Sequence, residues 1–423
     1  MRRAAALAAL AAFLLGLPGW SAGDRESTRE TAPPDSPPAA RERSSPATEV
    51  LRRACRFLWD EQGEDGAWHS ETYSFLRGGQ ALTPFVLEAL LGVGEEPWAR
   101  RRDGVRRALR FIRRHVSPEG IVGDSDPDLP EYPGYATALA LLCLVEAGQP
   151  GDAGLVERLR RGLVSRQYRR ESGFDRQAPV HGGWGFGAPR GSRPGHVDIS
   201  YTRHVLEALR AAGGVDATVF GRAERFLEFL QRHPADLRPQ PSSLEPGVLR
   251  RTPAPYDGGF YFSPVVLAAN KGGLADDPEG APYFRSYATA TCDGVLALLA
   301  AGVPGEDERL ARARAWLAAH PTLERPEGIP RDTPERWAEA VHTYHLAVRA
   351  AAYEALHWPG DWRRRIAVHL AARQQADGSF VNRRGHLMKE DDPILCTVLA
   401  VIALSPGSPA GRRVLAEAAE DGG

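Results

Sequence analysis

The segment Phe57-Leu58-x3-Gln62-x2-Asp65-Gly66-Ala67-Trp68 decides the fold, because copies of it recur along the rest of the chain. A nearly complete copy returns near the C-terminus as Leu370-x3-Gln374-x2-Asp377-Gly378-Ser379-Phe380. Two further copies carry insertions and two are degenerate: Leu163-x3-Gln167 with His181-Gly182-Gly183-Trp184, Leu227-x3-Gln231 with Asp257-Gly258-Gly259-Phe260, Pro118-Glu119-Gly120-Ile121-Val122, and Pro326-Glu327-Gly328-Ile329-Pro330. A motif repeated at intervals predicts an architecture of similar units, here six.

Each copy separates two predicted helices of different character. The helix before the motif is amphipathic with arginines on one face, as in residues 101–116, 154–168 and 307–320. The helix after it is more apolar and richer in alanine, and a helix that is apolar on every side is buried. These predicted inner helices are residues 81–94, 135–148, 200–213, 287–302, 337–356 and 393–404. Each unit is therefore predicted to be a hairpin with an exposed outer helix and a buried inner helix.

The motif residues have structural roles in this interpretation. Asp-Gly makes the turn that leaves the outer helix, because glycine adopts backbone angles that other residues resist. The glutamine can bond backbone groups at the end of the outer helix, and the aromatic residue can pack against the adjacent repeat. No catalytic role is expected for the motif.

The Leu-x3-Gln-x2-Asp-Gly-x-Trp pattern resembles the QW repeat of squalene and hopene cyclases. The series of hairpins is similar to protein prenyltransferase β-subunits, and the resemblance covers roughly residues 47–405. It implies an all-α (α/α)6 toroid, in which six inner helices form a ring around a central cavity and six outer helices surround them. Six copies match closure of such a ring. The resemblance is weaker for activity, because one fold hosts many functions.

Composition and net charge argue against some classes of binding partner. The chain has 423 residues, 43% of them hydrophobic, which is enough for a large core. Its net charge of -1 gives no electrostatic case for binding nucleic acid or an anionic membrane. Only Lys271 and Lys389 are lysines. We attribute the arginine excess to a GC-rich bacterial coding bias rather than to phosphate recognition.

The N-terminus is typical of a secretory signal. Arg2 and Arg3 precede the apolar run 4–17, and small residues follow at 21–23. The predicted division is a signal peptide (1–23), a disordered Pro/Ser-rich tether (24–46), a repeat domain (47–408) and a C-terminal tail (409–423). The protein is therefore predicted to be exported, periplasmic or extracellular, without an integral membrane segment after cleavage. An uncleaved anchor is the alternative.

The four cysteines are predicted to be buried small hydrophobes. Each belongs to a different repeat and none forms a C-x-x-C pair, although export would permit disulfides. They are Cys55, Cys143, Cys292 and Cys396.

Loop lengths predict one functional face. The links from outer to inner helices are long at 169–197, 234–285 and 321–336, whereas the reverse links are short. Long loops on one side of a rigid scaffold usually carry function. The N-termini of the inner helices open onto the same face and favour an anionic ligand or carboxylates there.

The fifth inner helix carries a polar stripe. Glu339, His342, His345 and Arg349 are spaced three, three and four residues apart, so they share one face. On a buried helix this stripe is expected to face a polar cavity. The alternative is a self-satisfied ladder of ion pairs and hydrogen bonds that closes the ring.

Two mechanisms implied by the resemblance lack complete motifs. Prenyltransferases hold zinc with an Asp two places before a Cys, plus a later His. Before Cys292 that position is Ala290, with Asp293 adjacent instead, so we predict no metal and no cofactor. Class II terpene cyclases need Asp-x-Asp-Asp as their acid, and the nearest match is Lys389-Glu390-Asp391-Asp392. Asp391 and Asp392 are equally suited to capping the helix that begins at Pro393.

Three hypotheses about function remain open. The first is a non-catalytic protein of the cell envelope that binds an unidentified small molecule or an envelope protein. The second is a toroid enzyme with a polar centre, although charged lining argues against hopene-type cyclisation. Its candidate catalytic residues are His342, His345, Asp293, Asp391 and Asp392. The third is an α/α-barrel acting on a saccharide, with Glu207 and Glu339 as a pair of acids across the cavity.

Overall fold

The computed structural model describes residues 46–94, 101–189, 195–278 and 280–405. The predicted signal peptide, the C-terminal tail and all of the tether except Pro46 lie outside these ranges. Pro46 begins the first described helix, one residue before the predicted start of the repeat domain.

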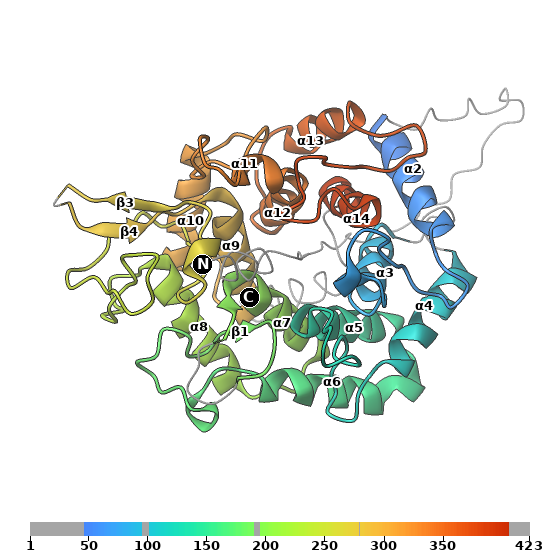
Figure 1. The fold of residues 1–423 in the computed structure, drawn as a ribbon, viewed down its shortest axis with the longest axis horizontal. Coiled ribbons are helices and arrows are strands. Elements are labelled where there is room, and N and C mark those ends of the chain that lie inside the picture. Colours follow the sequence, from blue (N-terminus) through green and yellow to red (C-terminus); the bar gives the residue numbers. More distant parts are fainter. Residues whose placement is uncertain (1–45, 95–100, 190–194, 279, 406–423) are drawn as a thin grey trace, which may run out of the picture.

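Twelve helices alternate between an outer and an inner layer in the described chain (Figure 1). The outer helices are α2 (Pro46–Asp60), α4 (Arg102–Arg114), α6 (Ala153–Ser165), α8 (Ala217–Gln231), α10 (Glu308–Ala319) and α13 (Trp362–Ala371). The inner helices are α3 (Leu82–Gly92), α5 (Pro133–Ala147), α7 (Ile199–Ala212), α9 (Ala288–Ala301), α12 (His342–Ala355) and α14 (Pro393–Leu404).

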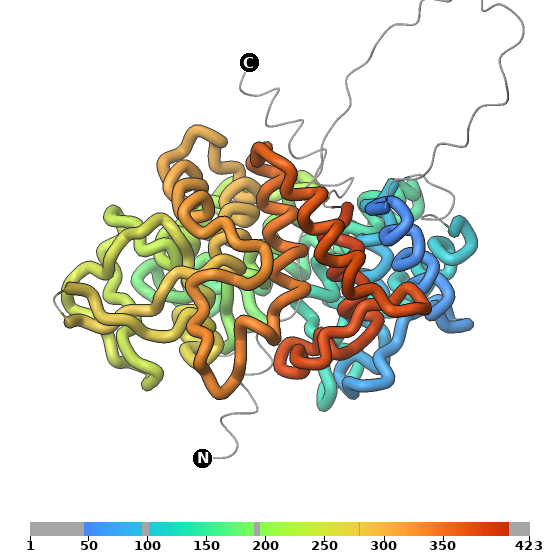
Figure 2. Tube along the Cα trace, turned by 90° about the horizontal axis from the view of Figure 1, so that it is seen from above, coloured from blue at the N-terminus to red at the C-terminus, as the bar shows by residue number. Residues whose placement is uncertain are grey.

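The inner helices form a closed ring. Each contacts the next in chain order, from α3 through α5, α7, α9 and α12 to α14, and α14 contacts α3 again. Both views show the red C-terminal hairpin beside the blue N-terminal helix (Figures 1 and 2), and α2 contacts both α13 and α14. The predicted all-α toroid of six hairpins is confirmed.

In four of the six repeats, the motif glutamine ties the hairpin to its neighbour. Gln62 Nε2 donates to the carbonyl of Gly66 in its own turn and to that of Gly104 in the next outer helix, both at 2.9 Å. The same pair of bonds recurs at Gln167, Gln231 and Gln374. Gln374 reaches Val50 in α2 and so joins the last repeat to the first. The predicted backbone role of the glutamine is confirmed, and the bonds also reach across to the following outer helix.

The motif glycine allows neighbouring outer helices to approach. Gly66 has φ +92°, and a Cβ there would lie 2.7 Å from the carbonyl oxygen of Arg107. The inner helix supports the same turn, because Thr83 Oγ1 accepts the N–H of Trp68 at 3.2 Å. Four other inner helices use a threonine in this way: Thr137, Thr202, Thr291 and Thr397. The threonine was not identified as part of the repeat from the sequence.

The core lies between the two layers. The inner helices α3, α5 and α14 are buried along nearly their whole length, whereas the outer helices bury one face. All four cysteines are free and buried, as predicted.

The fifth inner helix is interrupted, which differs from the continuous helix predicted for 337–356. A short helix, α11 (Trp337–Ala340), ends at Val341, and α12 begins at His342. The reason is a side-chain cap, because the Glu390 carboxylate accepts the N–H groups of Thr343 and Tyr344 at 2.9 and 2.8 Å. Those N–H groups therefore need no carbonyl partners from a preceding helical turn.

The long links contain the strands and most of the short helices. Strand β1 (Trp184–Gly185) pairs antiparallel with β2 (Val197–Asp198), and β3 (Leu274–Asp276) with β4 (Pro282–Phe284). The 3-10 helices are η2 (Ser74–Leu76), η3 (Pro150–Asp152), η4 (Arg170–Ser172) and η5 (Leu267–Ala269). Within the described ranges, no helix is long and apolar enough to cross a membrane.

Candidate functional site at the ring centre

Polar side chains from three inner helices meet at the centre of the ring. Arg203 on α7 donates to Asp293 on α9 at 2.9 Å, and Tyr344 on α12 donates to the other oxygen of Asp293 at 2.5 Å. Ser200 Oγ on α7 lies 3.4 Å from the Tyr344 hydroxyl. Helix α9 lies between α7 and α12 in the ring (Figure 1), and Asp293 on α9 links the side chains of the two helices.

Asp198 begins α7 beside this network. Its Oδ1 accepts the N–H of Tyr201 at 2.9 Å, which caps the helix. Its Oδ2 is buried and has no hydrogen-bond partner among the described residues. His196 Nε2 lies 3.8 Å from Oδ2, which is too far for a hydrogen bond. One carboxylate oxygen of Asp198 is therefore left without a hydrogen bond by the described residues.

Lys271 comes to the same place from the long insertion before α9. Its ammonium lies 4.6 Å from the ring centroid of Phe262 and 5.2 Å from that of Trp337. Burial lowers the pKa of Lys271 to about 8, although the charges of Asp198 and Asp293 oppose the shift. We call Asp198, Ser200, Arg203, Lys271, Asp293 and Tyr344 the ring-centre cluster.

Burial raises the pKa values of both aspartates in this cluster. It raises the pKa of Asp198 well above the ordinary value, and the nearby charge of Asp293 adds to this shift. Burial also raises the pKa of Asp293, but Arg203 opposes the shift and holds this carboxylate in a charged hydrogen bond. Burial therefore favours the uncharged form of Asp198, whereas the N–H of Tyr201 and the charge of Lys271 favour its carboxylate. His196 stays neutral, because burial lowers its pKa to about 4.

Aromatic rings border the cluster on the side of α5. Tyr135 and Tyr201 stack with centroids 3.8 Å apart, and the imidazole of His204 meets Tyr135 edge-on at 5.0 Å. All three side chains are buried. The centre thus combines an aromatic wall with charged groups.

Of the residues predicted to be catalytic, only Asp293 belongs to the ring-centre cluster. His342 Nε2 lies 2.7 Å from His369 Nε2 on outer helix α13. His345 Nε2 lies 3.2 Å from the carbonyl oxygen of Thr322, and Arg349 donates to the carbonyl of His320 at 2.7 Å. The expectation that this stripe faces the central cavity is wrong, because its members contact the outer layer.

Asp391 and Asp392 contact the segment that leads into α3. Asp392 caps α14 by accepting the N–H of Leu395 at 2.9 Å, and it accepts the hydroxyl of Ser70 at 2.5 Å. Asp391 accepts the hydroxyl of Tyr73 at 2.5 Å. The capping role considered for this pair is confirmed for Asp392.

Cys292, Asp293 and His345, which would have to come together to hold zinc, have separate partners. Asp293 contacts Arg203 and Tyr344, Cys292 contacts Arg349, and His345 contacts Thr322. Across the described ranges, no group of three or more His, Cys, Asp or Glu side chains is placed to hold a metal ion.

The two acids predicted to act on a saccharide, Glu207 and Glu339, do not lie together either. Glu207 accepts from Arg203 at 2.9 Å near the centre. Glu339 is bound to Arg336 and Arg384 at the exposed end of α11. Glu339 is therefore already engaged at the surface, and it does not oppose Glu207 across a cavity.

Two acids that sequence analysis missed stabilise inner helices from a neighbouring repeat. Glu131 accepts the N–H groups of Gly78, Gln80 and Ala81 before α3, at 2.5, 2.6 and 3.2 Å. Glu390 does the same for α12 and is fully buried. The sequence does contain a pattern that could have identified these acids. Each stands two or three residues before the proline that begins the next inner helix.

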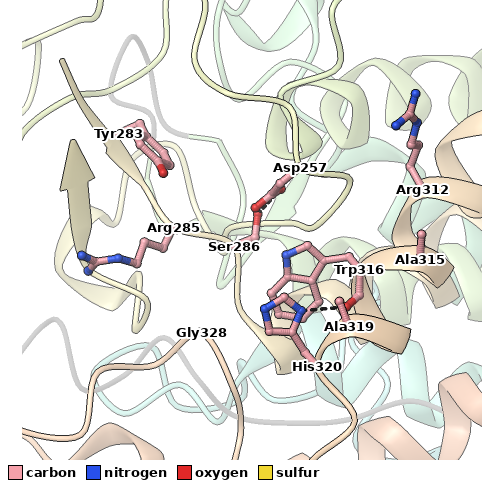
Figure 3. Close-up of a pocket in the computed structure, with 10 residues that line it drawn as sticks. All are labelled: Asp257, Tyr283, Arg285, Ser286, Arg312, Ala315, Trp316, Ala319, His320 and Gly328. Carbon is pink, nitrogen blue, oxygen red and sulfur yellow. Dashed lines mark hydrogen bonds between the residues drawn. The ribbon is translucent and has the colours of Figure 1, made fainter. Parts of the chain in front are cut away.

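A separate pocket of about 510 Å³ lies outside the ring, between the segment before α9 and helix α10 (Figure 3). Trp316 and His320 stack on one side, with centroids 3.8 Å apart. Across from them, Ser286 donates to Asp257 at 2.8 Å and accepts from Arg232 at 2.7 Å. Both hydrogen bonds of the Ser286 hydroxyl are therefore made within the protein. His320 Nδ1 lies 2.7 Å from the Trp316 carbonyl oxygen and does not activate Ser286.

The chain has structural neighbours at low sequence identity. It is similar to the type II terpene cyclase MstE from Scytonema, with a TM-score of 0.49 and 13% identity over 85% of this chain and 98% of that chain. It is also similar to the GH76A α-1,6-mannanase from Salegentibacter sp. HEL1_6, with a TM-score of 0.49 and 8% identity over 87% and 99%. No protein-family model matches the chain, and the search of curated proteins gave no match.

Proposed function

We propose that the protein binds a neutral, polyhydroxylated small molecule, of the saccharide class, at the ring-centre cluster. The observation that supports this most directly is a set of buried polar atoms without partners among the described residues: Asp198 Oδ2, Arg203 Nη2 and the Tyr201 hydroxyl. A buried polar group without a hydrogen bond costs roughly 1–3 kcal/mol, so native proteins usually satisfy it with a ligand or water.

Charge balance favours a neutral ligand. Arg203 and Lys271 supply two positive charges, and Asp293 with Glu207 supplies two negative charges. Burial raises the pKa of Asp198, which disfavours a third negative charge in the cluster. Such a cluster offers both donors and acceptors but little net charge, and hydroxyl groups can meet both. The tyrosine wall adds an apolar face of the kind on which sugar rings pack.

Two tyrosines on α12 provide a matched test. Tyr344 donates to Asp293 in the cluster, whereas Tyr353 accepts from Arg349 outside it. We expect Tyr344→Phe to weaken binding of a neutral oligosaccharide by about tenfold, the effect of one lost hydrogen bond to a charged group. Tyr353→Phe should leave affinity unchanged. Calorimetric titration against a panel of neutral mono- and oligosaccharides measures both, and failure of the whole panel to bind would reject the proposal.

The same site supports a second candidate, an enzyme in which Asp198 donates a proton. Its raised pKa is the observation that favours this, since a general acid must hold its proton near the working pH. Asp198→Asn keeps an acceptor for the N–H of Tyr201. Any turnover of saccharides, squalene or isoprenoid diphosphates by the wild type should then disappear while ligand binding persists. Loss of binding alongside turnover would argue against a proton-donor role.

We also propose that binding takes place outside the cytoplasm. The support is the charged, apolar and small-residue sequence of residues 2–23. Expression in a bacterial host followed by fractionation tests this, with N-terminal sequencing of the mature chain. Retention of the whole chain in the cytoplasm would contradict the proposal.

A further inference from the structure

We propose a second binding site, for a phosphorylated ligand, on the outside of the ring between the α6–α7 link and helix α8. A pocket of about 960 Å³ lies there, open to solvent, and it is independent of the ring-centre cluster. Five arginines line it: Arg169, Arg170 and Arg176 from the link, and Arg222 and Arg225 from α8. Glu171 and Asp175 are the acids in the lining, so the pocket carries a net positive charge.

Most of this charge is not neutralised locally. Arg169 lies 3.4 Å from Glu171, but within the described part of the chain the other four arginines form no ion pair. Arg222 is held by neutral groups, since it donates to Gln167 Oε1 at 2.8 Å and to Thr218 Oγ1 at 3.2 Å. Burial lowers the pKa of Arg222 and the charge of Arg169 lowers it further, while the charges of Glu171 and Asp216 partly oppose the shift. The arginine-rich composition explains how many arginines exist, but not why five of them converge on a pocket that has two acids in its lining.

His181 indicates which anion fits. It lines the pocket and is buried, and its Nδ1 lies 3.0 Å from the carbonyl oxygen of Phe174. Nδ1 must donate to this carbonyl, so Nε2 of the neutral ring is an acceptor. Nε2 is buried and has no partner among the described residues. Burial lowers the pKa of His181, and Arg238, Arg222 and Arg225 lower it further, so the ring stays neutral.

The pocket therefore offers several cationic donors and one neutral acceptor. A hydrogen phosphate group matches this set, because its ionised oxygens accept from arginine and its P–OH donates to His181 Nε2. A sulfate group has the same shape and charge without the O–H donor. The volume exceeds that of one inorganic phosphate, so the natural ligand is expected to carry more than one phosphate or a phosphate on a larger body.

Titration calorimetry with three probes tests the site on the full chain at pH 7 and low salt. The probes are inorganic phosphate, inorganic sulfate and tripolyphosphate. We expect tripolyphosphate to bind more tightly than phosphate, and phosphate more tightly than sulfate. The double variant Arg222→Gln/Arg225→Gln should weaken tripolyphosphate binding by about tenfold or more, because it removes two charge-assisted donors.

A matched double variant separates the pocket from general surface charge. Arg106 and Arg161 are exposed arginines on α4 and α6 outside the pocket, and Arg106→Gln/Arg161→Gln removes the same charge. This control should keep its affinity for tripolyphosphate at equal ionic strength. Equal weakening in both double variants, or unchanged affinity in the pocket variant, would overturn the proposal.

A variant of His181 tests the expected preference for phosphate over sulfate. His181→Phe removes the Nε2 acceptor and should bring the affinities for phosphate and sulfate together, with binding through arginine retained. Circular dichroism and thermal unfolding verify that each variant is folded. Persistence of the full phosphate preference in His181→Phe would rule out the assigned role of Nε2.

The phosphate that binds here could belong to a free small molecule or to a lipid headgroup. Flotation with vesicles containing phosphatidic acid, compared with free tripolyphosphate, distinguishes the two. Binding of either probe through Arg222 and Arg225 supports the site, and binding of neither overturns it.

Discussion

At the residue scale, buried acids at helix starts determine how the inner ring responds to pH. Glu390 accepts from two N–H groups of α12 and from the Asn382 side chain. Burial nevertheless raises the pKa of Glu390 to about 7, because these bonds only partly offset desolvation. The folded protein therefore holds this proton over a range of pH in which the unfolded chain releases it.

This shift predicts a loss of stability on raising the pH. The unfolded pKa is near 4.5 and the folded pKa is about 7. The contribution of Glu390 is thus fully present below pH 4.5 and decreases until the pH passes about 7. The loss is roughly 3 kcal/mol over this range. Glu390→Gln should remove this slope, as measured by urea unfolding at several pH values.

Glu339→Gln is the control for that experiment. Arg336 and Arg384 lower the pKa of Glu339, so its carboxylate stabilises the folded state above its unfolded pKa, which is the opposite sign. The effect of Glu339 is expected to be small, because the pair is solvated. If wild type and Glu390→Gln showed the same pH slope, the assigned role of Glu390 would be wrong.

At the element scale, the motif glycine is required by two constraints. Gly378 has φ +98°, which L side chains rarely adopt, and a Cβ there would lie 2.5 Å from the carbonyl oxygen of Arg53. Gly360 has nearly the same φ, +95°, but a Cβ at that position would have no other atom within 4 Å among the described residues. The two glycines therefore separate backbone strain from close approach of helices.

We expect Gly360→Ala to cost about 1 kcal/mol from backbone strain alone. Gly378→Ala adds the clash with α2 and should cost roughly 1–3 kcal/mol more. Chemical unfolding of the two variants beside wild type measures the difference. Equal costs would mean that α2 is not held against the last repeat as closely as the contact distance indicates.

At the scale of the whole molecule, closure of the ring gives the junction between the last and first repeats the same bonds as a junction within the chain. Gln374 Nε2 donates to Gly378 and Val50, which joins the last repeat to the first. Gln231 makes the matching bonds to Gly258 and Arg309 within the chain. In both side chains the Oε1 atom has no partner among the described residues, so the pair is closely matched.

Closure predicts that Gln374→Ala and Gln231→Ala cost the same. Each leaves two carbonyls without a donor, and the cost is expected to be roughly 1–3 kcal/mol. Both unfolding transitions should stay single with unchanged denaturant dependence. A chain with an open junction between the last and first repeats would lose stability only with Gln231→Ala.

Sequence analysis located the helices better than the site. Periodicity and the repeated motif identified both helix layers, because those signals are local. A stripe such as His342, His345 and Arg349 shows that residues share a face, but not which way that face points. Here His369 and the carbonyls of His320 and Thr322 engage it from the outer side.

The sequence by itself determined the number of hairpins and the order of the layers, and the resemblance to the QW-repeat family implied closure of the ring. Each motif encodes its own turn, and the four copies with a glutamine also encode a bond to the following outer helix. Only the tertiary structure decided the composition of the centre. Asp198, Lys271, Asp293 and Tyr344 belong to no shared motif, and they meet because the closed ring brings α7, α9 and α12 together and the insertion before α9 carries Lys271 to the same place.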